Sequence, residues 1–158
     1  MDTFSHALWG KGLFGYRGSK YAPFLLGAAP DLIAFFPLFI YKLVNGLYFE
    51  AIERPRIETI PEWVFTLYDF SHSFLTGFTI ILILYVLKKD TWFFAAFAWP
   101  FHTILDSLFH SKEFFATKIF FPLSNYSFDG ISWATPQVWF TNVGLLIVLF
   151  IYRKYPRR

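Results

Sequence analysis

Long apolar stretches separated by short polar segments dominate the chain. A helix needs about 20 residues to cross a bilayer. Four stretches approach that length: 23–43, 72–87, 92–109 and 136–152. A fifth apolar stretch, residues 3–16, is shorter and interrupted by glycines. The pattern predicts an all-α, polytopic membrane helical bundle of four transmembrane helices plus a short N-terminal helix, in a single membrane-embedded domain over residues 1–158.

Two polar connectors are expected outside the membrane. Residues 45–62 mix acidic and basic side chains and have the pattern of a surface segment. Residues 111–135 contain an apolar run, 114–121, that is broken by Lys118 and followed by a turn. This run is expected to lie on the membrane surface, either as a lid over a site or as a simple amphipathic helix.

The composition supports a membrane protein. The chain is 56% hydrophobic and 16% charged, and its mean hydropathy is +0.44, whereas a soluble domain is about 45–50% apolar and about 25% charged. A composition so hydrophobic and so poor in charge excludes a disordered protein, a secreted disulfide scaffold and a nucleic-acid-binding module. Because the chain has no cysteine, it has no disulfide, thiolate metal site or cysteine nucleophile.

The basic residues predict an orientation. Lys and Arg are enriched on the cytoplasmic side of membrane proteins. One set of helix ends carries nine of them: Lys11, Arg17, Lys20, Lys88, Lys89, Arg153, Lys154, Arg157 and Arg158. The opposite set carries five: Lys42, Arg54, Arg56, Lys112 and Lys118. We therefore expect a multi-pass protein of the cell membrane with its C-terminus in the cytoplasm and both connectors outside.

Ionisable residues interrupt the apolar stretches. Asp31, His102 and Asp106 lie inside them. The other histidines are His6, His72 and His110, so that all four histidines of the chain fall in or beside apolar segments. A charged side chain at the bilayer centre costs about 2.5–3.5 kcal/mol by insertion scales. Because these ionisable residues are costly to keep in apolar segments, their presence indicates a function. A shared metal ion is the interpretation that explains all of them together.

The spacing of these residues points to one site. His102, Asp106 and His110 follow each other at intervals of four residues, which places them on one face of a helix. A histidine followed by an aspartate at this interval can offer a nitrogen and an oxygen to the same ion. Asp2 and His6 repeat the interval. Counting along the expected helices places these groups in the outer half of the membrane.

Each candidate also has a simpler interpretation. Asp31 could cap a helix that restarts after a proline. Asp106 and His102 could form a structural pair, and each histidine could be a hydrogen-bonded packing residue. Asp2 and Asp69 are candidate outer partners of ligand imidazoles, although Asp69 has a plain surface role as its alternative.

Ordered motifs resemble a known family. They are Met-Asp-Thr-Phe-Ser-His at 1–6, Gly-Ala-Ala-Pro-Asp at 27–31, Ser-His-Ser at 71–73, His-x-x-x-Asp at 102–106 and a tail at 121–133. In this order they resemble the bacterial and archaeal membrane-bound metal-dependent hydrolase-like proteins, a family distantly similar to the all-helical, zinc-dependent phospholipase C. The resemblance implies five metal-ligand candidates: His6, Asp31, His72, His102 and Asp106.

The chain departs from the family pattern at two positions. Many members carry a second aspartate where this chain has Ile33, and a histidine where it has Leu67. These differences favour one or two ions over a larger cluster. His110 is a candidate additional ligand or proton shuttle.

These observations predict a membrane-embedded metal-dependent hydrolase. Mixed nitrogen and oxygen donors favour zinc, which would activate water for attack on a phosphoester or similar bond of a lipid-like substrate. Asp106 or Asp31 is the candidate general base. The alternative is an ion, proton or small-solute transport protein that uses the same buried cluster. A third possibility is a structural or regulatory membrane protein with a vestigial site.

Overall fold

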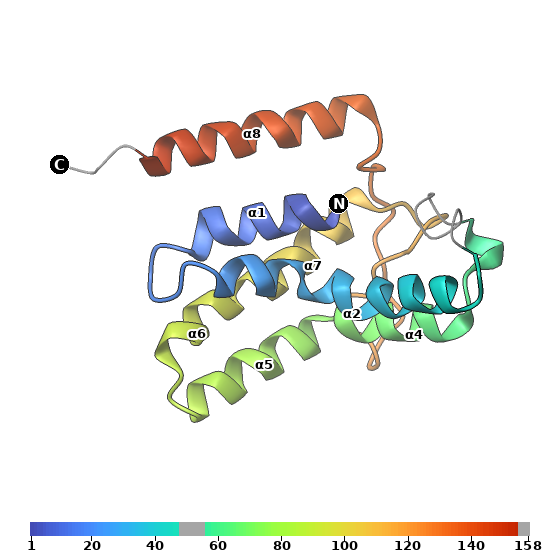
Figure 1. Cartoon of the computed structure of the whole chain (residues 1–158), viewed down its shortest axis with the longest axis horizontal. Coiled ribbons are helices and arrows are strands. Elements are labelled where there is room, and N and C mark those ends of the chain that lie inside the picture. Colours follow the sequence, from blue (N-terminus) through green and yellow to red (C-terminus); the bar gives the residue numbers. More distant parts are fainter. Residues whose placement is uncertain (48–55, 155–158) are drawn as a thin grey trace.

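The computed structural model describes residues 1–47 and 56–154 as an all-α protein, which confirms the predicted class (Figure 1). The elements are α1 (Thr3–Phe14), α2 (Ala22–Val44), the 3₁₀ turn η1 (Ile57–Thr59), α4 (Glu62–Ser71), α5 (Phe74–Val86), α6 (Asp90–Ala96), α7 (Ala98–Phe109) and α8 (Pro136–Lys154). Part of the expected connector 45–62, including Arg54, lies outside the described residues, as do Arg157 and Arg158.

Two helices are each long and apolar enough to cross a membrane, α2 and α8. Helices α4 and α5 qualify only together, as one span bent by 53°. The expected span 92–109 is divided at Phe97 into α6 and α7. Pro100 explains where α7 starts, because a proline fits the first turn of a helix, where the backbone N–H groups have no intrahelical partner. The described residues therefore contain two or three candidate spans where the sequence predicted four.

Helix α2 runs through both Pro30 and Pro37 without ending. Asp31 therefore lies inside this helix, and the interpretation of Asp31 as the cap of a restarted helix is wrong. The sequence analysis also missed α4. The expected span 72–87 took His72 as its first residue, whereas His72 is the C-cap of α4, at the bend between α4 and α5.

Two glycines allow α1 and α2 to cross closely. A Cβ atom added at Gly10 would lie 2.3 Å from the carbonyl oxygen of Pro23, and one added at Gly27 would lie 2.6 Å from the carbonyl oxygen of His6. Ordinary side chains do not tolerate such approaches. The small residues therefore let the backbone of α1 rest directly on α2, and this contact brings His6 beside the part of α2 that carries Asp31.

The distribution of side chains is inverted relative to a soluble protein. Leu82, Phe140 and Val148 are 59%, 67% and 63% exposed, whereas His72 and Asp106 are completely buried. Large apolar side chains at the surface together with ionisable groups in the centre fit a protein whose outer face contacts lipid. The fold is thus consistent with contact with a bilayer.

The connector 111–135 packs down onto the helices instead of forming one of its own. Phe115 and Ile119 are buried, and the Ser73 hydroxyl donates to the carbonyl of Phe121 at 2.7 Å. The backbone N–H of Phe74 donates to the carbonyl of Ile119. The amphipathic-helix interpretation is therefore wrong, and the segment covers the bend between α4 and α5.

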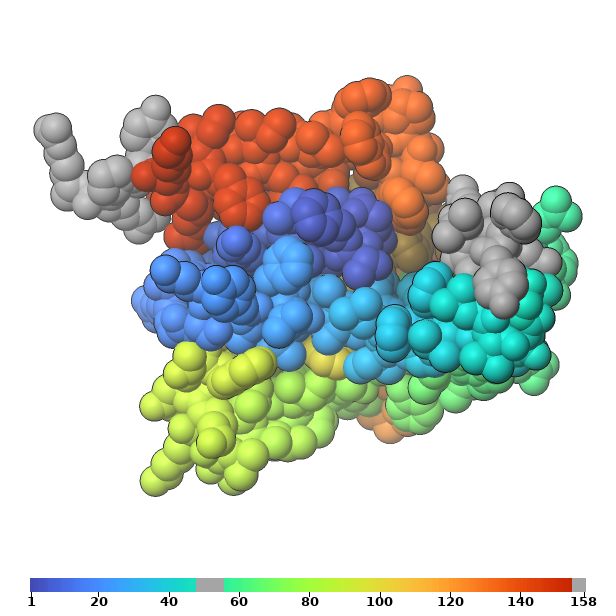
Figure 2. Space-filling model, viewed as in Figure 1, coloured from blue at the N-terminus to red at the C-terminus, as the bar shows by residue number. Residues whose placement is uncertain are grey.

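Seven of the eleven described Lys and Arg residues belong to turns and helix ends at one end of the molecule, and four belong to the opposite set. Figure 1 places the α1–α2 turn, the α5–α6 turn and the C-terminal end of α8 together at the left, while α4 lies at the opposite end. Figure 2 shows α8 lying along α1 at one edge of the same view. The arrangement agrees with the grouping of helix ends on which the predicted orientation depends.

Candidate metal centre

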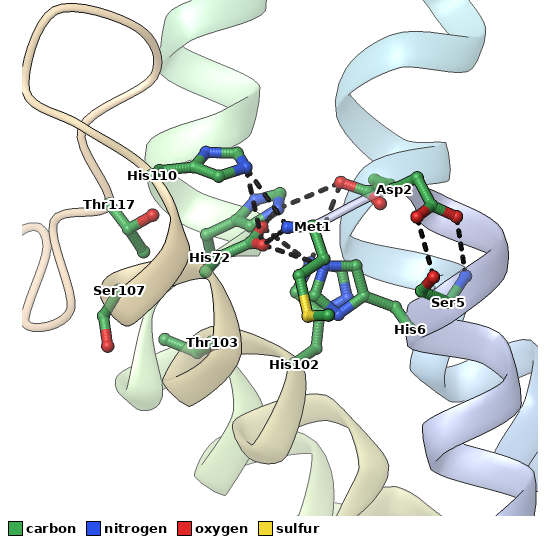
Figure 3. A network of polar contacts seen from close by, with 12 residues as sticks. Met1, Asp2, Ser5, His6, His72, His102, Thr103, Ser107, His110 and Thr117 are labelled. Atoms are coloured by element: carbon green, nitrogen blue, oxygen red, sulfur yellow. Dashed lines mark hydrogen bonds and ion pairs between the residues drawn. The ribbon is translucent and has the colours of Figure 1, made fainter. Parts of the chain in front are cut away.

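Four buried side chains from three parts of the fold converge in the centre of the protein. They are Asp31 of α2, His72 at the α4–α5 bend, and His102 and Asp106 of α7. One ligand-type atom from each lies within 4.8 Å of all the others. Figure 3 shows the imidazoles of His72 and His102 turned toward this point. The sequence analysis predicted all four residues.

Both imidazoles direct Nε2 at the two carboxylates. His72 Nε2 lies 3.3 Å from Asp31 Oδ1 and 3.3 Å from Asp106 Oδ2. His102 Nε2 lies 3.7 Å and 3.2 Å from the same two oxygens. Two nitrogens and two oxygens thus face one another across a space from which solvent is excluded.

The opposite ring nitrogens fix the tautomers. His72 Nδ1 lies 3.0 Å from the carbonyl oxygen of Tyr68, and His102 Nδ1 lies 2.7 Å from that of Gly27. Ser71 Oγ also lies 2.9 Å from His72 Nδ1, and it donates to the carbonyl of Tyr68 at 3.3 Å, so it can accept from that ring nitrogen. A carbonyl oxygen only accepts hydrogen bonds, so these contacts favour Nδ1 as the donor in both rings, and a neutral ring of this tautomer keeps its lone pair on Nε2. Each lone pair then points at a carboxylate oxygen. This arrangement is repulsive unless a cation lies between them or the rings are protonated.

Several buried atoms in this cluster lack a hydrogen-bond partner. Among the described residues they are His6 Nδ1, Asp31 Oδ2, His102 Nε2 and Asp106 Oδ2. A buried polar atom without a partner costs about 1–3 kcal/mol, and more where the group is charged. Two carboxylates and two imidazole nitrogens in such a space form a donor set that fits a divalent cation, and tetrahedral zinc is bound by these donor types.

The second oxygen of Asp106 gathers further groups. His6 Nε2 lies 2.8 Å from Asp106 Oδ1, and the amino group of Met1 contacts the same oxygen. His110 Nε2 lies 3.5 Å from it. The His6 ring also stacks on that of His102, with centroids 3.6 Å apart. Asp106 therefore presents one oxygen to the four-residue cluster and the other to His6 and His110.

His110 reaches Asp106 by a different geometry from the one expected. Helix α7 ends at Phe109, and His110 is its C-cap with an extended backbone. Its Nδ1 lies 3.1 Å from the Tyr68 hydroxyl and 3.2 Å from the carbonyl of Phe115. Burial lowers the pKa of His110 to about 4. The ring is therefore neutral near pH 7.

Asp2 and Asp69 have other partners than the predicted ones. Asp2 caps α1, because its carboxylate accepts from the backbone N–H and the hydroxyl of Ser5 at 2.8 and 2.7 Å. Asp69 pairs with Lys118 Nζ at 2.7 Å. The backbone carbonyls of residues 68 and 27 contact the imidazoles of His72 and His102 instead.

The sequence analysis missed these carbonyl contacts, because every residue carries a backbone carbonyl and its position in the sequence does not mark it. The side chain of Tyr68 adds a contact of its own, because its ring stacks on His72 with centroids 3.7 Å apart. Its hydroxyl lies 2.9 Å from Thr117 Oγ1 of the connector. The connector and the cluster are therefore linked through this tyrosine.

Comparison with known proteins gave no significant match to a family model, a curated protein or a solved structure.

Proposed function

We propose that this chain is a membrane-embedded metal-dependent hydrolase whose divalent cation, zinc by its donor set, is held by Asp31, His72, His102 and Asp106. The observation that carries the proposal is the pair of buried Nε2 atoms that face two carboxylates, each with a backbone carbonyl behind the opposite ring nitrogen. The motif resemblance to membrane-bound metal-dependent hydrolase-like proteins supports the same interpretation.

The residues divide the chemistry between them. A divalent ion in this site would lower the pKa of a coordinated water toward neutrality. Asp31 Oδ1 and Asp106 Oδ2 face the imidazoles of the site, so the other oxygen of each carboxylate is the one available to take a proton. Of these two, Asp31 Oδ2 has no hydrogen-bond partner, whereas Asp106 Oδ1 already accepts from two groups. We therefore assign the proton of the attacking water to Asp31. The water oxygen forms a bond to phosphorus, the bond to the leaving oxygen breaks, and Asp31 returns the proton to that oxygen.

The membrane setting selects the substrate. We infer a lipid-like phosphoester, because the cluster lies among helices whose outer surfaces are apolar. In this proposal the α4–α5 and α6–α7 pairs each cross the membrane as a broken span. Together with α2 and α8 they make four crossings, while α1 enters only part of the way. The C-terminal end of α8 then lies in the cytoplasm with the other basic ends.

The buried polar groups favour an enclosed site over a transport pathway. A pathway needs polar groups along the whole depth of the membrane. Toward the basic end, however, the buried residues of α5 are Gly77 and Ile81, and those of α6 are Ala95 and Ala96. The polar cluster thus meets apolar packing on that side among the described residues.

Elemental analysis of the detergent-purified protein tests the proposal. We expect one or two zinc ions per chain, lost on chelation and regained on addition of zinc. His102→Ala and Asp106→Ala should each lose the metal while still inserting into membranes. Ser107→Ala is the matched control, since this buried hydroxyl of α7 donates to the carbonyl of Ile104 and not to the cluster. Metal-free wild-type protein, or full retention in both variants, would refute the site.

A further inference from the structure

A groove lies between α7 and α8. Helix α8 packs closely on α1 alone among the described helices, so a space of about 440 Å³ remains beside it. Trp9, Phe101 and Leu105 line one side of this α7–α8 groove, and Val138 and Leu145 line the other. Its volume falls within the range of about 300–1,000 Å³ that is typical of small-molecule sites.

The groove adjoins the candidate metal centre. Met1 lines it, and the amino group of the same residue contacts Asp106. Leu105 and Phe109 also line it, and these residues lie directly before Asp106 and directly before His110 in the chain. Met1 therefore reaches from the groove to Asp106 of the cluster.

We propose that the α7–α8 groove holds the acyl chain of a lipid whose phosphoester is the substrate of the metal centre. This inference rests on the proposed function. One wall is α8, a candidate membrane span, so the groove is expected to face hydrocarbon, where water and polar ligands are unfavourable. The polar side chains that line the groove are Gln137, Thr141 and Asn142. The Asn142 amide already bonds Trp9 and Ser5, so Gln137 and Thr141 are the groups that could face the ester region of a lipid.

A second groove on the other side of α8 provides an internal control. Its volume is about 770 Å³, and it runs along α1 and α8 to Lys11 and Lys154. It reaches the site region only at Asp2 and Ser5, whose side chains bond to each other. A lipid in that groove would thus lie beside the cap of α1 rather than beside Asp106.

Photolabelling tests occupancy without requiring catalysis. The probe is a phosphatidylcholine with a diazirine on one acyl chain, reconstituted with the full chain in nanodiscs. We expect label on Leu105 and Val138, and a loss of that label in Val138→Trp or, as a second variant, Leu145→Trp. Val143→Trp, which fills the control groove, should keep it. Absence of label from the groove of the wild-type protein, or unchanged labelling in the filled variants, would overturn the proposal.

Turnover tests whether the occupant is the substrate. The probes are ethyl and dodecyl para-nitrophenyl phosphate, which share one leaving group. Val138→Trp should lower kcat/KM for the dodecyl ester by about tenfold or more and change that for the ethyl ester by less than about twofold. An equal effect on both esters would overturn the role of the groove. Hydrolysis of neither ester by zinc-loaded protein would count against the proposed function, and the photolabelling result would still decide occupancy.

Discussion

A buried histidine is oriented to bind a metal ion through one ring nitrogen when a hydrogen bond from its other ring nitrogen fixes the tautomer. In this protein the backbone holds it, through the carbonyls of Tyr68 and Gly27. The Gly27 carbonyl belongs to α2, which packs beside His102, and the Tyr68 carbonyl belongs to the helical turn before His72. The backbone therefore favours one tautomer of each ring without a second charged side chain. Avoiding a further carboxylate keeps the buried charge low.

Tyr68→Phe should separate the structural role of this residue from ligand binding. The substitution removes the hydroxyl that meets His110 and Thr117 but leaves the ring that stacks on His72 and the carbonyl behind it. We expect the free energy of unfolding to fall by about 1–3 kcal/mol, because buried partners lose their hydrogen bond. Zinc content should remain that of the wild type.

Unfolding in detergent, followed by tryptophan fluorescence, measures the change in stability. Elemental analysis of the same sample measures the zinc. Tyr126→Phe is the control, since Tyr126 is 53% exposed and its loss of a hydroxyl should change neither quantity. Loss of zinc from Tyr68→Phe would show that the four-residue cluster is not sufficient to hold the ion.

The residues of the cluster could be predicted from the sequence because they are expensive to bury. Asp31, His72, His102 and Asp106 stand out against apolar neighbours, and an interval of four residues joins two of them. Their outer contacts could not be predicted in the same way. A backbone carbonyl carries no sequence signal, and Asp69, which seemed suited to the role, has Lys118 as its partner.

At the scale of elements, the ends and crossings of helices place the side chains of the buried cluster. The α4–α5 bend presents His72, and the end of α7 turns His110 back to Asp106. The sequence analysis placed α2 and α8 well, because long uniform apolar runs predict helices. It missed α4 and the α6–α7 break, because segments of 7–13 residues are too short to be distinguished by hydrophobicity alone.

The α1–α2 crossing is the element contact most sensitive to a single methyl group. In Gly27→Ala the new Cβ would meet the carbonyl of His6 at 2.6 Å, so the backbones must separate and carry His6 away from Asp106. We expect a loss of about 1–3 kcal/mol in the free energy of unfolding, as for other overpacked contacts.

Gly144→Ala is the matched control on α8. A Cβ at Gly144 meets nothing within 4 Å, and alanine is the better helix former by up to about 1 kcal/mol. This variant should be as stable as the wild type or slightly more so. Denaturant titration of the two variants in one detergent provides the comparison, and equal stability of Gly27→Ala and wild type would mean that the close crossing is not formed.

On the scale of the whole molecule, the two ends differ in charge and in structure. One end collects the turns that carry Lys88 and Lys89 and the basic end of α8. The connector 111–135 covers the α4–α5 bend, where His72 lies. If the bilayer surrounds the apolar belt between them, the two ends face different compartments. The positive-inside tendency assigns the cytoplasm to the basic end.

Single cysteines can test this orientation directly, because the chain contains no cysteine of its own. Lys89→Cys and Lys112→Cys replace two exposed lysines at opposite ends. A membrane-impermeant maleimide added to intact cells should label Lys112→Cys and leave Lys89→Cys unlabelled until the membrane is permeabilised. Labelling of both in intact cells would contradict a bilayer between the two ends, and the reversed pattern would place the connector and the cluster beneath it on the cytoplasmic side.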